Sequence, residues 1–362
     1  MRASAMVLEA PRTLERRQFP LPHIEDDDAL LRVEACGLCG TDHEQYSGEL
    51  FGGFAFIPGH ESVGTIESIG ELAAKRWGVA VGDRVAVEVF QSCRRCDRCA
   101  NGDYRHCRRH GIGDSYGFIP ADRAPGLWGG YAKYQYLGPD SMLLKVPDSL
   151  DAITATLFNP LGAGIRWGAQ IPETGSGDVV AVLGPGIRGL CSVVAARQAG
   201  AEYVLVTGAG TRDRSRLETA RSFGADLVVD VTKDDPVREL KRAVGRGADV
   251  VVDVTARAPD ALNQAVRLVR PEGTIVVAGI RGSPITSGFN ADLLVYKEIK
   301  ILGALGVDVS AYQSALDLLA STSLPFAGID RSVVGFDDLG SLLDSMSKGD
   351  LDTPIHAVVV PD

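Results

Sequence analysis

The sequence contains no uninterrupted apolar run long enough to cross a membrane. Its longest apolar region, residues 179–201, is broken by several glycines, a proline and an arginine, whereas a bilayer span needs about 20 consecutive apolar residues. Residues 1–17 mix arginine and glutamate with isolated apolar side chains and lack the continuous apolar stretch of a secretory signal. We therefore expect a cytoplasmic protein that does not interact with membranes.

Clustered basic residues are also missing. The 362 residues carry a formal net charge of −10, and they contain no run of about five or six Lys and Arg residues of the kind that forms interaction tails. Nucleic acids and anionic membrane surfaces are recognised through clustered positive charge. The sequence thus argues against a nucleic-acid partner and favours a small-molecule ligand.

Internal repeats and low-complexity linkers are absent as well, and the composition is that of a globular protein. Apolar residues make up 45% of the chain and charged residues 23%, a balance that can bury a core. A chain of 362 residues is too long for one ordinary core. Two domains are the expectation.

The hydrophobic pattern changes along the chain. Short β-rich runs such as 29–34 and 84–90 are separated by Gly, Pro and Asp clusters in the first part, which is typical of an irregular β-domain. From about residue 178, apolar strands alternate with helices, as in 179–183 and 190–199. This alternation predicts an α/β fold with a doubly wound parallel sheet of the Rossmann type.

These patterns predict a domain division. Residues 156–305 should form the dinucleotide-binding domain, and residues 1–155 the β-rich domain, which the segment 306–362 rejoins.

Four of the seven cysteines stand in a C-x2-C-x2-C-x7-C pattern, formed by Cys93, Cys96, Cys99 and Cys107. Four thiolates at this spacing satisfy a tetrahedral zinc ion and leave no coordination position open. The pattern predicts a structural zinc lobe over residues 90–110. Unligated thiols or an iron–sulfur site are the alternatives, and both are less consistent with four such closely spaced cysteines.

A G-x-G-x-x-G motif, Gly184, Gly186 and Gly189, follows the apolar strand 179–183 and opens a helix. Glycines at these positions permit a tight turn, close approach of a pyrophosphate to the backbone and close helix–strand packing. We expect the dinucleotide to contact Gly184, Gly186, Ile187, Arg188, Gly189, Thr207, Gly208, Arg212 and Thr255.

The end of the next strand bears on the choice of cofactor. NAD-binding folds usually place an acidic residue there for the ribose hydroxyls, but this sequence has Gly208, with Arg212 and Arg214 shortly after it. An arginine can pair with a 2′-phosphate, so NADP is favoured over NAD. The alternative is that both arginines are solvated and that Asp213 takes the acidic role.

Two further segments, residues 36–44 (CGLCGTDHE) and 59–64 (GHESVG), precede the cysteine lobe and the glycine motif. Together the four ordered motifs resemble the zinc-containing medium-chain alcohol dehydrogenase family, in its threonine and polyol dehydrogenase-like branch, over essentially the whole chain. The resemblance implies that the β-rich domain is GroES-like, and it implies a homodimer or homotetramer.

The resemblance also implies a catalytic centre. It makes Cys39 and His60 zinc ligands, Thr41 the hydroxyl that passes on the proton of the alcohol, and Asp42 the partner that orients His60. Zinc lowers the pKa of a bound alcohol and stabilises the alkoxide, which gives hydride to the nicotinamide. Thiolate and imidazole suit zinc, and an imidazole ligand needs a hydrogen-bonded partner.

The sequence departs from the family at two points. The third zinc ligand is often Cys, Glu or Asp, but the matching position here is Asn159, whose neutral amide is a poorer ligand. Glu61 could complete the set. The outer end of the proton relay often carries histidine, but Glu44 stands there with His43 before it, and either could accept the proton.

The substrate is expected to be a secondary or cyclic alcohol, a polyol, or the corresponding ketone. Aromatic residues hint at a partly apolar substrate, although such residues are more often part of a core; they are Phe51, Phe54, Phe56, Phe90 and Trp128. Two alternatives remain: a metal-free NADPH-dependent carbonyl or enone reductase on the same scaffold, and a nucleotide-binding protein without catalytic activity.

Overall fold

The computed structural model describes residues 1–50, 55–256, 258–280, 288–321 and 324–362. The chain forms two compact units. The first comprises Met1–Phe158, Leu316–Ser323 and Asp330–Asp362, and the second comprises Asn159–Ala315 and Leu324–Ile329. Among the described residues, no helix has the length and apolar character needed to cross a membrane.

The first unit is built on a mainly antiparallel, seven-stranded sheet in the order β14-β15-β3-β4-β5-β7, with β6 also paired to β3. Its strands are β3 (Ala29–Leu38), β4 (Glu61–Ile69), β5 (Arg84–Val87), β6 (Tyr134–Leu137), β7 (Leu143–Lys145), β14 (Arg331–Val334) and β15 (His356–Val359). A hairpin of β1 (Arg2–Ala10) and β2 (Thr13–Pro20) joins the same hydrophobic core.

Helices of the first unit are short, apart from α12 (Phe336–Lys348). The others are α1 (Gly40–Ser47), α2 (Glu71–Trp77), α3 (Asp97–Ala100) and α4 (Ala152–Ala155). α1 packs against α12. The buried core of this unit includes Phe56 and Trp128, while Phe90 is half-buried and Phe51 and Phe54 lie outside the described residues.

The second unit has a parallel, six-stranded sheet in the order β10-β9-β8-β11-β12-β13. The strands are β8 (Val179–Leu183), β9 (Tyr203–Gly208), β10 (Leu227–Asp230), β11 (Ala248–Asp253), β12 (Val269–Val277) and β13 (Lys300–Gly303). This is the doubly wound order: the chain adds β9 and β10 on one side of β8 and then adds β11, β12 and β13 on the other side. The sequence-based prediction of a parallel Rossmann sheet is confirmed.

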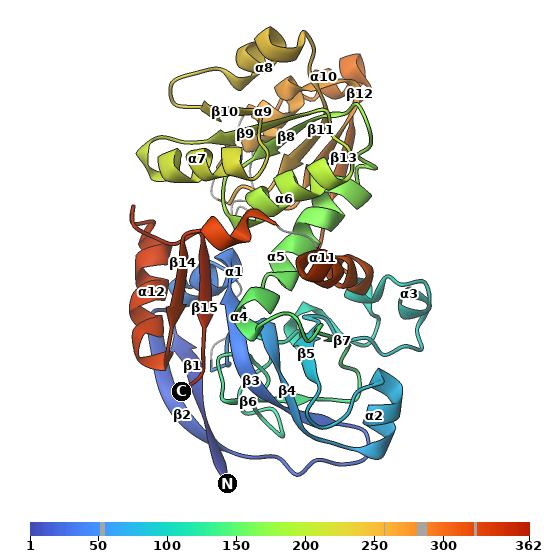
Figure 1. Cartoon of the computed structure of the whole chain (residues 1–362), viewed down its shortest axis with the longest axis vertical. Helices are drawn as coiled ribbons and strands as arrows, with labels where there is room; N and C mark the ends of the chain where they lie inside the picture. The colour runs from blue at the N-terminus through green and yellow to red at the C-terminus, as the bar shows by residue number, and fades with distance from the viewer. Residues whose placement is uncertain (51–54, 257, 281–287, 322–323) are drawn as a thin grey trace. The chain divides into compact units, whose positions relative to one another are not determined.

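Helices alternate with these strands along the chain: α6 (Ile187–Gln198), α7 (Arg214–Ser222), α8 (Pro236–Val244), α9 (Ala261–Leu268) and α10 (Asp292–Lys297). Figure 1 shows α6 and α7 along one face of the sheet and α8, α9 and α10 along the other. Every residue of β8 is buried. A strand covered on both faces requires such a continuous apolar run, and this explains why β8 shows no polar alternation.

Two further helical segments come before and after the strands of this sheet in the chain, and the last residues of α11 are assigned to the first unit. α5 (Phe158–Ile165) leads into a π-helical turn at Arg166–Gln170, and α11 (Val309–Ser321) follows the last strand. β13 and α11 continue the alternation of strands and helices that the sequence predicts from about residue 178 onward.

A buried histidine on β15 links the C-terminal strands to the rest of the first unit. His356 is 1% exposed, its Nδ1 accepts a hydrogen bond of 3.0 Å from Arg331 Nε, and its Nε2 lies 3.4 Å from Thr156 Oγ1. Burial, with the charge of Arg331 as a second cause, lowers the pKa of His356 to about 3. The imidazole is therefore neutral in the folded protein.

This histidine should make the stability of the protein depend on pH. Because its pKa is lower in the folded than in the unfolded state, where it is about 6.5, its contribution is complete above pH 6.5 and is lost as pH falls toward 3. Between pH 7 and pH 5 the loss should be about 2 kcal/mol. Denaturant unfolding of wild type and of His356→Gln should show this difference in pH dependence. Equal pH dependence in the two proteins would contradict it.

Candidate active site and metal centres

A cysteine and a histidine meet at the junction of β3, α1 and β4. Cys39 is the N-cap of α1, and His60 immediately precedes β4. Cys39 Sγ lies 3.2 Å from His60 Nε2, and the two residues are 3% and 5% exposed. Two zinc-preferring donors from segments 21 residues apart are thus brought together in a buried site.

Asp42 holds these two donors in place. Its carboxylate accepts hydrogen bonds from the backbone N–H of Cys39 at 2.9 Å and of Gly59 at 3.3 Å. One carboxylate oxygen also lies 3.7 Å from His60 Nδ1. A carboxylate at the second ring nitrogen fixes the ring of a metal-binding histidine, and the ligand atoms of Cys39, Asp42 and His60 all lie within 4.8 Å of one another.

Glu61 lies directly beside this group. It pairs with Gly37 across β3 and β4, and a Cβ atom on Gly37 would lie 2.3 Å from Glu61 Oε2. A side chain at residue 37 would therefore displace the Glu61 carboxylate, which occupies the space above this glycine. Among the described residues, Glu61 is not part of the 4.8 Å group.

The residues that the sequence analysis predicts for a proton relay lie on α1. Thr41 and His43 are half-buried, and Glu44 is buried. Residues three positions apart share a face of a helix, whereas residues two apart do not. Glu44 is therefore closer than His43 to the helix face that carries Thr41.

Asn159 belongs to the second unit. Its amide nitrogen donates a 2.8 Å hydrogen bond to Tyr312 Oη, and its amide oxygen lies 3.4 Å from a guanidinium nitrogen of Arg188. The guanidinium of Arg188 also stacks 5.3 Å from the ring centroid of Trp167. The amide is thus tied into a polar network within its own unit, a network that spans 153 residues of sequence and that the sequence did not predict.

The four cysteines of the predicted zinc lobe converge. Their sulfur atoms all lie within 4.8 Å of one another. Cys96 caps α3, where its sulfur accepts the backbone N–H of Cys99 at 3.4 Å, and Cys107 Sγ accepts that of Arg109 at 3.4 Å. Backbone N–H groups of Arg108 and Cys99 lower the pKa of Cys96 to about 6. Such N–H···S contacts stabilise thiolates, the form that binds zinc.

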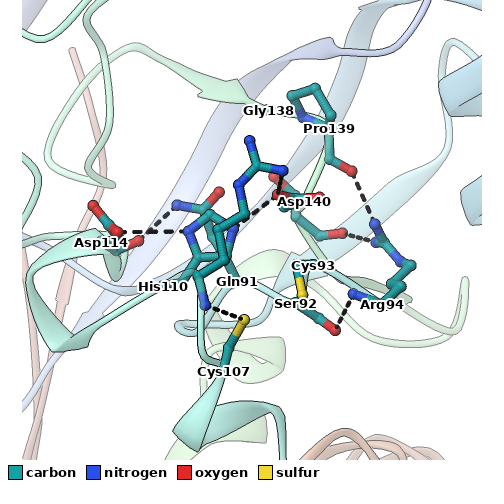
Figure 2. Close-up of polar contacts among 12 residues, drawn as sticks. Gln91, Ser92, Cys93, Arg94, Cys107, His110, Asp114, Gly138, Pro139 and Asp140 are labelled. Carbon is teal, nitrogen blue, oxygen red and sulfur yellow. Dashed lines mark hydrogen bonds and ion pairs between the residues drawn. The ribbon is translucent and has the colours of Figure 1, made fainter. Parts of the chain in front are cut away.

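The helical segments of this lobe contribute little hydrophobic core. The helix α3 has no buried residue, and the next turn, Tyr104–His106, buries only Tyr104. Figure 2 shows Cys93 and Cys107 among the polar residues beside the lobe. A four-thiolate metal site would supply the cross-link that a small hydrophobic core does not provide.

The glycine motif forms the turn between β8 and α6. Gly184 has φ +105°, and a Cβ atom on Gly189 would lie 1.9 Å from the carbonyl oxygen of Gly184. Both positions therefore require glycine, one for its backbone conformation and the other for the close approach of helix to strand. Gly186 is the N-cap of α6, so the N–H groups of the first helical turn, from Ile187 onward, point out of this turn.

Two aspartates that the sequence analysis did not single out lie near this turn. Asp253, at the end of β11, is fully buried, and it accepts hydrogen bonds from Thr255 N at 3.0 Å and Thr255 Oγ1 at 2.6 Å. The side chain of Thr255 in turn lies next to Gly184. Asp230 accepts the backbone N–H of Gly210 at 2.9 Å. An acidic residue at the carboxyl end of a buried parallel strand is the sequence signal that could have identified both aspartates.

The end of β9 carries Thr207 and Gly208. Thr207 is buried, and its hydroxyl lies 3.4 Å from Gln264 Oε1. Asp213 folds back over Gly208: its carboxylate accepts the N–H of Ala209 at 2.8 Å, and its Cβ lies 2.9 Å from where a Cβ on Gly208 would be. Arg212 and Arg214 are exposed.

Both units match known families. The model of the alcohol dehydrogenase GroES-like domain matches residues 25–148, and that of zinc-binding dehydrogenases matches residues 189–321. The fold, the glycine turn and the two donor clusters define a zinc-binding dehydrogenase with a GroES-like domain.

Similar proteins of known family identify the family within this class. A protein of Mycobacterium tuberculosis (strain H37Rv) named "Probable alcohol dehydrogenase adh" is 63% identical over 360 residues, which cover 99% of this chain and 98% of the relative. Sorbitol dehydrogenase of Bacillus subtilis is 32% identical over 324 residues, which cover 88% and 86%. The chain belongs to the zinc-containing medium-chain alcohol dehydrogenase family, and it is an oxidoreductase of that family.

Solved structures agree on the fold. A zinc-binding dehydrogenase of Sinorhizobium meliloti 1021, solved with bound NADP, has a TM-score of 0.85 at 26% identity, and all of both chains is covered. Alcohol dehydrogenase TADH of Thermus sp. ATN1 has a TM-score of 0.85 at 25% identity with the same coverage.

Proposed function

We propose that this protein is a zinc-dependent, NAD(P)-linked alcohol dehydrogenase that acts on a secondary or cyclic alcohol or a polyol, and on the corresponding ketone. The observation that carries the proposal is the buried contact of 3.2 Å between Cys39 Sγ and His60 Nε2, oriented by Asp42. A thiolate and an imidazole with a carboxylate behind it are a donor set suited to zinc.

Cys39 and His60 would hold this metal, and Glu61 is the adjacent anionic group that could complete the ligand set. When bound, zinc acts as a Lewis acid that lowers the pKa of an alcohol. Asn159 has a neutral amide side chain. Its hydrogen bonds to Tyr312 and Arg188 favour a role as a polar contact rather than as a zinc ligand.

The chain's own part in the reaction is to move the proton of the alcohol. The Thr41 hydroxyl would accept that proton and pass it outward along α1. Glu44 shares the helix face of Thr41, so we favour it as the next acceptor over His43.

The substrate class follows from the relatives. Relatives of this chain include proteins named sorbitol dehydrogenase, at 32% identity, and erythritol/L-threitol dehydrogenase, at 29% identity. The names of these relatives support a polyol or another secondary alcohol as the substrate here.

Zinc content tests the proposed catalytic metal. Wild type should hold about two zinc ions per chain, one in each donor cluster. Cys39→Ala and Cys99→Ala should each hold about one, as measured by metal analysis of the purified proteins. Cys36→Ala is the matched control, because Cys36 is fully buried beside the site but outside both clusters, and it should keep both ions.

Equal zinc contents in wild type and Cys39→Ala would contradict a catalytic metal. One zinc ion in wild type, together with reductase activity that survives mild chelation, would favour the metal-free carbonyl or enone reductase. Failure to transfer hydride to or from any alcohol or ketone would favour the non-catalytic nucleotide-binding protein.

We also propose that NADP is preferred over NAD. Residue 208 offers no carboxylate to the ribose, and the exposed guanidinium groups of Arg212 and Arg214 could pair with a 2′-phosphate. The position of Asp213 over Gly208 is the feature that would favour NAD instead.

Binding titrations should therefore favour NADPH over NADH. In the Arg212→Gln, Arg214→Gln double variant this preference should fall by about tenfold, because a charge-assisted contact is lost. Arg238→Gln, an exposed arginine of α8, is the control and should not change it. A wild-type preference for NADH that Asp213→Asn abolishes would contradict the proposal.

A homo-oligomer is the third part of the proposal. β13 is an edge strand whose four residues are all exposed, and it carries Ile301 and Leu302 beside the exposed Val295 and Tyr296 of α10. An exposed apolar edge strand is prone to pair with another chain, and a twofold axis would join two such edges.

Charge placed on this edge should disrupt the assembly. Wild type should sediment as a dimer or tetramer, whereas Leu302→Lys should reduce the assembled fraction strongly, because two lysines would face each other across the axis. Leu351→Lys replaces a more exposed leucine of the first unit and should leave the assembly unchanged. A monomeric wild type, or the same mass for both variants, would contradict this edge.

All seven cysteines lack disulfide bonds in the structure. Reduced cysteines are typical of the cytosol and support the proposed cytoplasmic location.

A further inference from the structure

A polar pocket of about 670 Å³ lies in the first unit beside the cysteine lobe. Five arginines line it, and they come from four separate stretches of the chain: Arg76 on α2, Arg94 and Arg95 in the lobe, Arg109 after its last cysteine, and Arg123 in the following loop. Positive charge is therefore concentrated at one place in a chain whose net charge is −10.

Three of the five arginines are neutralised within the pocket. The ion pairs are Arg76 with Asp27, Arg109 with Asp140 at 3.4 Å, and Arg123 with Asp114 at 2.5 Å. Two of these acids also hold His110, whose Nε2 lies 2.8 Å from Asp140 and whose Nδ1 lies 3.6 Å from Asp114. Figure 2 shows His110 between the two carboxylates. The acids of the pocket are therefore already engaged with cations or imidazole.

The other two arginines have no acidic partner of this kind. Arg94 directs its guanidinium to the carbonyl oxygen of Pro139 at 2.9 Å and to that of Ser141 (Figure 2). It holds a left-handed backbone conformation, φ 56°, which is unfavourable for a side chain of this size. Arg95 is exposed and makes no ion pair with any residue that the structure describes. Among the side chains that line the pocket, the arginines therefore outnumber the carboxylates by two.

We propose that this pocket binds a small organic phosphate. Guanidinium groups match the oxygens of a phosphate in both charge and geometry, and a dianion would balance the two arginines that lack an acidic partner. The volume lies within the range of small-molecule sites. Trp128 lines the pocket as well and offers an apolar wall to the organic part of the ligand.

The geometry of Arg94 suits this function. Because the carbonyl oxygens of Pro139 and Ser141 hold its guanidinium, little side-chain freedom would be lost on binding, and preorganisation of this kind increases affinity. The ligand would connect α2, the cysteine lobe and the loop at residue 123. Its binding should therefore raise the melting temperature of the protein.

The test is calorimetric titration of the zinc-loaded full chain with phenyl phosphate in the presence of saturating NADP⁺, which blocks the phosphate sites of the cofactor. We expect saturable binding at one site per chain. Benzenesulfonate, which has a similar shape and the same number of terminal oxygens but a single charge, should bind at least about tenfold more weakly, since its weaker charge reduces the strength of each charge-assisted contact.

Variants assign the binding to the pocket. Arg95→Gln and Arg94→Gln should each weaken phenyl phosphate binding by about tenfold. Arg98→Gln is the matched control, because Arg98 belongs to the same lobe but does not line the pocket and pairs with Asp103 at 3.1 Å. The affinity of this variant for phenyl phosphate should stay within about twofold of wild type. Arg95 makes no contact that the fold needs, and unchanged zinc content would show that its variant is intact.

Three results would overturn the proposal. One is the absence of saturable binding when NADP⁺ is present, which would assign any binding to the cofactor site. Another is equal affinity for phenyl phosphate and benzenesulfonate. The third is an affinity of Arg95→Gln equal to that of Arg98→Gln. None of these results depends on the catalytic metal or on the substrate of the dehydrogenase.

Discussion

The candidate catalytic centre depends on the antiparallel pairing of β3 with β4. This register sets Gly37 opposite Glu61, and it brings the residue that follows β3 and the residue that precedes β4 to the same end of the sheet. Cys39 and His60 therefore meet at 3.2 Å, although neither lies in a strand. A slip of one residue would turn every side chain of β4 to the opposite face. The buried core on this sheet is what makes such a slip costly.

Glycine supports both functional regions, for the same physical reason. At Gly37 the missing side chain leaves room for a buried carboxylate, and at Gly189 it lets helix α6 approach the carbonyl of Gly184. In each case the function needs a close approach that a Cβ atom would prevent.

The two donor clusters of the first unit are stabilised differently. Cys39 and His60 are embedded in the core, where Asp42 and two backbone N–H groups fix them before any metal arrives. The helix α3 and the turn Tyr104–His106 of the cysteine lobe bury only Tyr104, and the arrangement of the four cysteines would depend on the metal itself. The arginine pocket adjoins this second region, so its ligand and the metal of the lobe would hold neighbouring parts of the same polar surface.

The sequence by itself determined the features that depend on the local backbone or on short spacing. The doubly wound sheet followed from buried apolar runs, the dinucleotide turn from three glycines whose roles are local, and the cysteine cluster from four residues within one loop. The family, too, was evident from ordered motifs. Each of these rests on interactions between residues close in the chain, which a pattern can express.

Only the tertiary structure decided which distant side chains meet. It tied Asn159 to Tyr312 across 153 residues, placed Arg331 against the neutral His356, and gathered five arginines from separate segments into one pocket. The physical reason is that strand register and loop path, rather than residue type, fix these distances. The same arginines would read as solvated surface charges in any sequence, because their convergence is a property of the fold.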